Sequence, residues 1–125
     1  MRVYVKESGE FKSLEFIDPR SGVNNARDLI GNYGALDDGQ FEYDPELESY
    51  TCTAETFDWW GKVLTDLEAA EERILEVKEE YPEHAEQIDE VTQAATDTDL
   101  EYHATAVNKA LDEFIESVNR KREGV

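Results

Sequence analysis

The sequence predicts an α+β fold, in which a small N-terminal antiparallel β-sheet with a short helix is followed by a helical hairpin or three-helix bundle. Two observations predict it. Over much of residues 1–52, apolar residues alternate with polar ones, as in strands with one buried face. From residue 54 they recur at spacings of three, four and seven, as in helices that pack on one another. We expect a single domain, residues 1–125, with a β-rich part (1–52) and a helical part (53–125).

Residues 2–17 form the first predicted hairpin. Val3 and Val5 alternate with more polar neighbours, and a Ser8-Gly9-Glu10 turn then reverses the chain before a second alternating stretch. Two strands alone are only marginally stable in water, so this hairpin must pack on other elements.

The rest of the β-rich part is predicted to hold a short helix and a second hairpin. Apolar residues recur at helical spacing over 22–33, with Ser21 as the expected N-cap. Residues 40–52 alternate again around an Asp-Pro turn and end at Cys52. As the single cysteine, Cys52 cannot form an internal disulfide, and we expect it to be buried at a strand end.

The longest predicted element is a helix from Ala54 to Tyr81, with Thr53 as its N-cap and Pro82 immediately after it. Its apolar residues form a heptad seam: Trp60, Val63, Leu67, Ala70, Ile74, Val77 and Tyr81. A helix of this length extends beyond a small sheet, so it needs helical partners to cover the seam.

Two further helices are predicted to supply that cover. Residues 83–95 carry a short apolar stripe, and Thr98 with Glu101 forms a capping box that starts the last helix. The stripe of this helix, from Leu100 to Val118, can cover the seam within one chain. We therefore expect a monomer, because the net charge also opposes self-association.

Acidic residues outnumber basic ones by 31 to 12, and the net charge is −19. Acidic and basic residues number 11 and 5 over residues 1–50, 14 and 3 over 51–97, and 6 and 4 over 98–125, so the excess is concentrated in the centre. Such a charge repels nucleic acid and anionic membranes, and it attracts cations or a basic protein surface. We expect no direct binding to either nucleic acid or membrane. The alternative is that the acidity only keeps the protein soluble or reflects a salt-loving source.

No catalytic or metal-binding motif is found in the sequence. The Glu-x-x-His pattern of di-iron bundles is absent, because Tyr81 precedes His84 and Leu100 precedes His103 at that spacing. Both histidines are expected at the surface of helices, and no glycine-rich elbow presents a nucleophile. We predict no enzymatic activity, no metal and no cofactor. Without an apolar stretch for a signal peptide or membrane span, a cytoplasmic location is expected.

A row of carboxylates lies outside the seam of the long helix. Residues three or four apart on a helix lie about 5–6 Å from one another, which is comparable to the phosphate spacing of a nucleic-acid strand. Only Arg73 and Lys78 interrupt the row, which could fill the basic cleft of a nucleic-acid-binding protein. Trp59, at the edge of the seam, is either core or an exposed anchor for a partner. The predicted partner-binding residues are Trp59, Glu68, Glu71, Glu72, Glu76, Glu79, Glu80 and Glu83.

The chain also carries the segments ARDLIGNYGALDDGQF at residues 26–41 and ETFDWW at 55–60. These segments resemble small acidic accessory proteins of bacterial phages and conjugative elements, some of which are anti-CRISPR or antirestriction factors. The resemblance implies a non-enzymatic inhibitor in the cytoplasm of a bacterial host. By acidic mimicry of DNA, it would bind the basic nucleic-acid channel of a defence nuclease such as a CRISPR effector. Two alternatives remain: an acidic helical adaptor or antitoxin-like module that binds through Trp59, and a homodimer formed through the seam.

Overall fold

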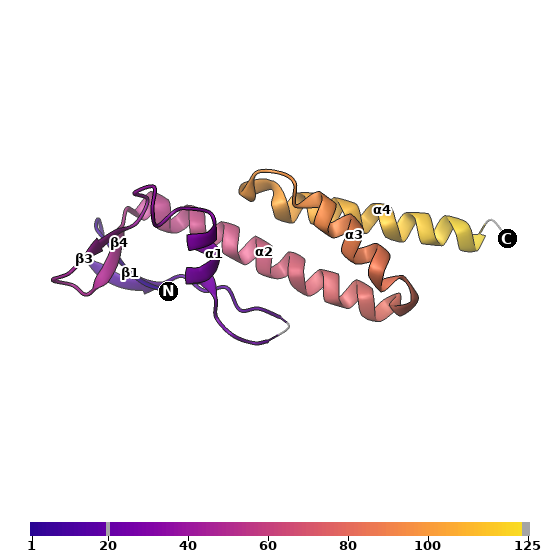
Figure 1. Cartoon of the computed structure of the whole chain (residues 1–125), viewed down its shortest axis with the longest axis horizontal. Coiled ribbons are helices and arrows are strands. Elements are labelled where there is room, and N and C mark those ends of the chain that lie inside the picture. The colour runs from indigo at the N-terminus through magenta and orange to yellow at the C-terminus, as the bar shows by residue number, and fades with distance from the viewer. Residues whose placement is uncertain (20, 124–125) are drawn as a thin grey trace. The chain divides into compact units, whose positions relative to one another are not determined.

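The computed structural model describes residues 1–19 and 21–123. It has the predicted α+β architecture, in which four strands come first and the long helices follow (Figure 1). The chain divides into two compact units, with residues 1–65 in the first and the chain from residue 66 onward in the second. The boundary lies inside the long helix, and not at the change in sequence pattern near residue 53. The reason is that the N-terminal part of the helix contributes its apolar side chains to the core of the first unit.

The first unit contains a four-stranded sheet of order β2-β1-β4-β3. Strands β1 (Arg2–Val5) and β2 (Glu10–Ser13) form one antiparallel hairpin. Strands β3 (Glu42–Asp44) and β4 (Ser49–Cys52) form another. Both hairpins occur where the alternation of the sequence predicts them.

The two hairpins meet through β1 and β4, which run parallel, so the sheet is mixed and not wholly antiparallel. Val3 lies opposite Tyr50, and Val5 lies opposite Cys52. Alternation in the sequence indicates which side chains face the core, but it carries no information on the direction of the neighbouring strand. Parallel neighbours need a long crossover connection, and the segment between β2 and β3 supplies it.

Helix α1 (Ala26–Asn32) lies in this crossover and is shorter than the predicted helix over 22–33. The side chain of Asn24 explains the later start. Its Oδ1 accepts hydrogen bonds from the backbone N–H of Phe16 and from that of the first helical residue, each at 3.2 Å. The expected N-cap, Ser21, instead accepts a hydrogen bond from the N–H two residues ahead, at 3.3 Å, in a local turn.

The core of the first unit is completed by the N-terminal part of α2 (Ala54–Glu80). Trp60 packs near Phe41, with ring centroids 6.5 Å apart, and its indole N–H donates to Oε1 of Gln40 at 3.0 Å. The predicted burial of Cys52 at a strand end is confirmed, and this burial raises the pKa of its thiol. The largest fully buried side chains of this unit are Val3, Val5, Leu14, Ile30, Phe41, Trp60 and Leu64.

Helix α2 begins at its predicted N-cap, Thr53. The Thr53 hydroxyl oxygen accepts a hydrogen bond from the N–H of Thr56 at 3.1 Å, and the Glu7 carboxylate accepts one from the N–H of Ala54. Two N–H groups that have no partner inside the helix are thus satisfied by side chains. Glu55 adds a negative charge in the first turn, where it complements the helix dipole.

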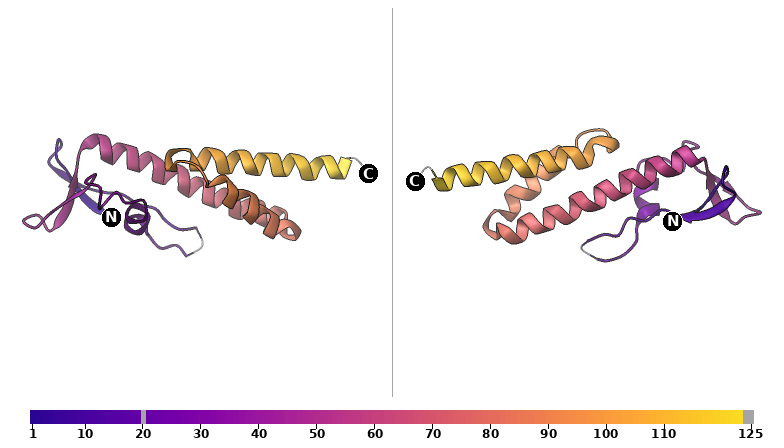
Figure 2. Two further views of the ribbon diagram at one scale, coloured as in Figure 1. Left: turned by 45° about the horizontal axis from the view of Figure 1, so that its top comes forward. Right: turned by 180° about the vertical axis from the view of Figure 1, so that it is seen from behind.

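The second unit is a three-helix bundle of the C-terminal part of α2, α3 (Ala85–Ala95) and α4 (His103–Glu123) (Figure 2). The 3₁₀ turns η1 (Pro82–His84) and η2 (Leu100–Tyr102) precede α3 and α4. The seam of α2 is covered within the chain, partly in this bundle and partly in the first unit. The buried core of the bundle consists of Ala70, Ile74, Val77, Tyr81, Ile88, Val107, Leu111, Phe114 and Val118.

The predicted capping box of Thr98 and Glu101 is wrong, because α4 begins only at His103. The Thr98 hydroxyl donates to the carbonyl of Ala95 at 3.4 Å. Nε2 of His103 donates to the carbonyl of Thr98 at 2.7 Å, which holds the intervening residues in a tight turn. The expected surface position of His103 is also wrong, since its side chain is buried. This backbone partner removes the cost of burying a polar imidazole nitrogen.

Candidate protein-binding surface

Four exposed carboxylates in the C-terminal part of α2 lie on the side of the helix that faces away from the bundle core. We call the following four exposed side chains the α2 acidic row: Glu72, Glu76, Glu79 and Glu80. Ile74 and Val77, between them in the sequence, are buried. This separation follows from the helical repeat, which brings residues three and four apart to the same side. Among the described residues, none forms an ion pair with a member of the row.

The two cations that interrupt the row in the sequence do not neutralise it. Arg73 extends to α4, where it donates to the backbone oxygen of Asn108 at 3.3 Å and to its Oδ1 at 2.9 Å, and pairs with the Asp112 carboxylate. Lys78 extends to α3, and its Nζ lies 2.8 Å from the Asp89 carboxylate. Both cations therefore connect α2 to the other helices of the bundle. Neither forms an ion pair with a carboxylate of the row.

The other three predicted carboxylates lie at the margins of this face. Glu68 and Glu71, on the preceding turns of the helix, are half-buried. Glu83 lies in η1, where its carboxylate is 3.8 Å from Nε2 of His84. The half-buried His84 ring in turn contacts Phe114, with ring centroids 5.6 Å apart. The structure thus brings four of the seven predicted carboxylates together on one open face.

Trp59, the other predicted binding residue, is 39% exposed and belongs to the first unit. Its ring meets Trp60 edge to face, with centroids 5.0 Å apart, and Trp60 is buried. Trp59 therefore covers the core with one side and presents the other to solvent. The acidic row and the exposed tryptophan are two separate candidate surfaces, one in each unit.

Within the described part of the chain, no group of three or more His, Cys, Asp and Glu side chains is arranged to hold a metal ion. None of the described helices combines the length and apolar composition needed to cross a membrane. Comparisons of the chain with protein-family models, with curated proteins and with solved structures find no match. The proposals below therefore depend on the geometry of the protein's own surface.

Proposed function

We propose that this chain is a non-enzymatic inhibitor that binds the basic nucleic-acid channel of another protein, with the α2 acidic row in the place of DNA phosphates. The observation that carries the proposal is that the row is exposed and not neutralised by Arg73 or Lys78. From Glu72 to Glu80 the carboxylates extend over about 12 Å of helix axis. They are spaced by about 5–6 Å, which suits a series of lysine and arginine side chains that bind a nucleic-acid backbone.

The packing of α2 in the bundle core favours tight binding by the row. Ile74 and Val77 fix α2 in the bundle core, so the backbone that carries the carboxylates is ordered before a partner arrives. A preordered surface loses less conformational entropy on association. The net charge of −19 adds long-range attraction towards a basic channel, which raises the association rate. Because these interactions are solvated and electrostatic, binding should weaken as salt is added.

The resemblance to anti-CRISPR and antirestriction factors favours a bacterial defence nuclease as the target, and in particular a CRISPR effector. Such effectors hold their heteroduplex in a positively charged channel that contacts the backbone without reading its sequence. A rigid row of carboxylates can compete for such a channel without imitating any base. Inhibition would then result from occupancy alone, and no catalytic residue is required.

Two triple variants separate the effect of the row from that of total charge. The row variant carries the replacements Glu72→Lys, Glu76→Lys and Glu79→Lys. The control variant carries three equivalent reversals in exposed residues between α3 and α4: Asp97→Lys, Asp99→Lys and Glu101→Lys. Both variants have the same net charge, so only the position of the reversed charges differs. Circular dichroism of each variant verifies that the helices are intact.

Each protein is immobilised and incubated with a bacterial lysate that contains a CRISPR effector, with and without added duplex DNA. The wild type and the control variant should retain the nuclease, and both DNA and raised salt should release it. The row variant should not retain it, and in a cleavage assay it should not inhibit. Equal retention by the row variant, or retention that neither DNA nor salt affects, would contradict the proposal.

A second candidate function is that of an adaptor or antitoxin-like module that binds through Trp59. The exposed 39% of this side chain, held in place against a buried ring, is the observation in its favour. Removal of an aromatic anchor typically costs about 2 kcal/mol or more of binding free energy, whereas peripheral charges act mainly on the association rate. The adaptor hypothesis therefore expects Trp59→Ala to lose the partner and the row variant to retain it.

A further inference from the structure

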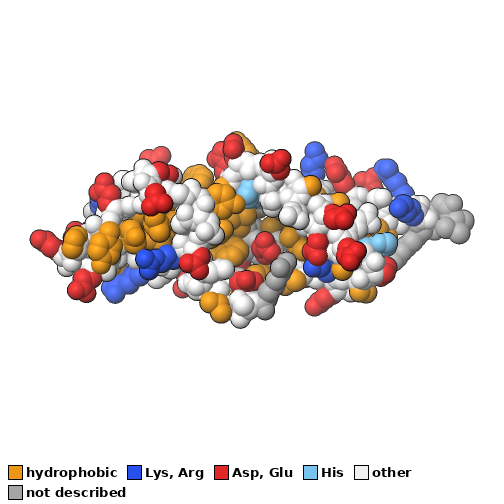
Figure 3. Space-filling model, in the orientation of Figure 1, with side chains coloured by type: hydrophobic (Ala, Val, Ile, Leu, Met, Phe, Trp, Pro, Cys, Tyr) orange, Lys and Arg blue, Asp and Glu red, His pale blue; other side chains and the backbone are white. Residues whose placement is uncertain are grey.

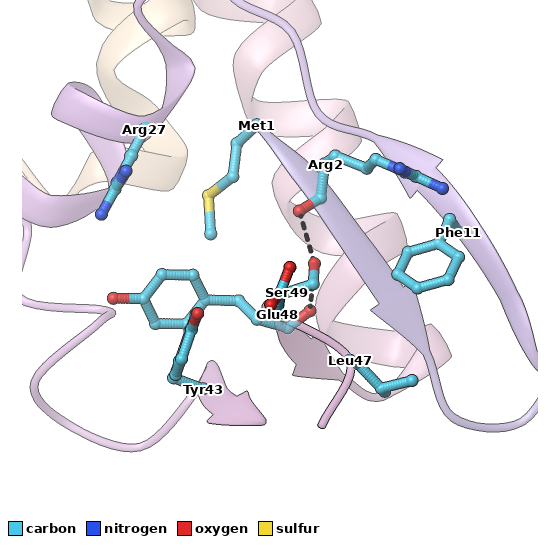
Figure 4. A pocket seen from close by; sticks show the side chains of 9 residues that line it. Met1, Arg2, Phe11, Arg27, Tyr43, Leu47, Glu48 and Ser49 are labelled. Atoms are coloured by element: carbon cyan, nitrogen blue, oxygen red, sulfur yellow. Dashed lines mark hydrogen bonds between the residues drawn. The ribbon is translucent and has the colours of Figure 1, made fainter. Parts of the chain in front are cut away.

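A cleft of about 620 Å³ lies at one end of the sheet in the first unit. It involves none of the residues of the α2 acidic row. The starts of β1 and β4, the turn between β3 and β4, and helix α1 surround it (Figure 4). Its lining combines aromatic rings, two arginines and one carboxylate: Phe11, Tyr43, Tyr50, Arg2, Arg27 and Glu48. The volume is within the range of about 300–1,000 Å³ that is usual for small-molecule sites.

Each of the two arginines lies over an aromatic ring. The guanidinium carbon of Arg2 is 4.2 Å from the ring centroid of Phe11, and that of Arg27 is 5.9 Å from the centroid of Tyr50. Figure 4 shows the two arginines on opposite sides of Met1. A guanidinium held over a ring still has N–H groups along its edge that can donate to an anion. The cleft therefore presents two positioned cationic groups.

These two arginines lack a carboxylate partner among the described residues, although acidic residues outnumber basic ones by 31 to 12 in this chain. The structure describes the side chains of four arginines. Arg73 and Arg120 form ion pairs with carboxylates, whereas Arg2 and Arg27 form none with any described residue. Both unpaired arginines line the same cleft. Glu48 is the one carboxylate among the residues that line the cleft, so the positive charge of the two arginines is available to an anion from outside the chain.

The aromatic rings of the cleft indicate that its ligand carries a planar group as well as a negative charge. Phe11 is 38% exposed and Tyr43 is 57% exposed, and the Tyr43 ring meets Tyr50 edge to face at 5.4 Å. Figure 3 shows hydrophobic side chains gathered over the sheet of the first unit, with basic side chains beside them. Exposed aromatic rings of this kind are platforms on which planar bases stack.

We propose that the cleft binds a small organic anion with a planar ring, and specifically a nucleoside monophosphate. The base would stack on the exposed rings, and the phosphate would accept hydrogen bonds from Arg27 or Arg2. A nucleic-acid polymer would bring many more negative charges into the field of a chain of charge −19. A single phosphate brings far fewer negative charges into that field, and the lining of the cleft offers it two arginines against one carboxylate, Glu48. This proposal does not depend on the function proposed for the α2 acidic row.

The first experiment titrates the full chain with adenosine monophosphate, adenosine or inorganic phosphate and follows the backbone amides by NMR. Adenosine monophosphate should shift the signals of residues around Phe11 and Tyr43. Adenosine and phosphate should each bind at least about tenfold more weakly, because each provides only one of the two kinds of contact. No shift at millimolar adenosine monophosphate, or equal binding of inorganic phosphate alone, would overturn the proposal.

The second experiment changes the charges of the cleft. Arg2→Gln and Arg27→Gln should weaken adenosine monophosphate binding, by about tenfold for the arginine that holds the phosphate. Glu48→Gln should strengthen it, because it removes the opposing carboxylate. Lys62→Gln, at an exposed position of α2 in the same unit, is the matched control and should have no effect. Binding that survives both arginine replacements, or that falls equally with Lys62→Gln, would reject the cleft as the site.

Discussion

Neutralising the α2 acidic row should stabilise the free protein, although most substitutions destabilise a fold. The replacements are Glu72→Gln, Glu76→Gln and Glu79→Gln, which remove charge but keep side-chain length and a high helix propensity. The three side chains are exposed and form no ion pair with a described residue. The substitutions therefore relieve repulsion without breaking a stabilising contact of that kind.

The expected gain can be estimated from the spacing along the helix. The like-charge pairs relieved are Glu68 with Glu72, Glu72 with Glu76, Glu76 with Glu79, and Glu76 with Glu80. Each such pair costs about 0.2–0.5 kcal/mol. Carboxylates near the C-terminal end of α2 also oppose the helix dipole, which costs about 0.3–1 kcal/mol more. The variant also loses the attraction between Arg73 and Glu76, which cancels the benefit of relieving one of the repulsive pairs. The free energy of unfolding should therefore rise by about 1–2 kcal/mol in total.

Urea unfolding followed by far-ultraviolet circular dichroism measures this gain, because urea is uncharged and does not screen the row. The gain should be largest at low ionic strength and should shrink at 1 M salt, where the Debye length is about 3 Å. Glu55→Gln is the matched control, and its expected effect on stability has the opposite sign. Glu55 lies in the first turn of the same helix, where its charge complements the dipole, so its loss should destabilise by about 0.3–1 kcal/mol.

A triple variant that is less stable than the wild type would refute this reasoning. A gain that is equal at low and high salt would refute it too, because the effect would then not be electrostatic. In either case the carboxylates would already be compensated in the free protein. The row would then hold no uncompensated charge for a basic partner to neutralise, and the proposed inhibitor function would lose its main support.

Four further predictions concern the two cores, the thiol and the oligomeric state. Leu111→Ala, in a fully buried position of the bundle, should lower the free energy of unfolding by about 2–5 kcal/mol in urea titrations. Trp60→Phe removes the hydrogen bond to Gln40 and should cost about 1–3 kcal/mol by calorimetry, more than the same change at Trp59. Burial raises the pKa of Cys52, so a thiol reagent at pH 8 should modify the folded protein far more slowly than the urea-unfolded chain; equal rates would count against a buried thiol. Light scattering should give the mass of one chain, and a dimer mass would favour the seam as an interface.

Features that depend on neighbouring residues could be predicted from the sequence alone. The extent of α2, its N-cap at Thr53 and both hairpins follow from local periodicity and local hydrogen bonding. The separation of buried Ile74 from exposed Glu72 is of the same kind, since it requires only the helical repeat. A heptad seam also indicates that a partner helix must exist. It does not indicate which helix that is.

Tertiary structure alone decided the features that depend on contacts between distant segments. The parallel pairing of β1 with β4, the burial of His103 and the pairing of Arg73 with Asp112 all join residues whose spacing in the sequence carries no signal. The cleft is the clearest case, because Arg2 and Arg27 lie in different elements and come together only when the crossover between the hairpins is in place. Periodicity reports which face of an element is apolar. Which element covers that face, and which polar groups meet there, depends on the packing free energy of the whole unit.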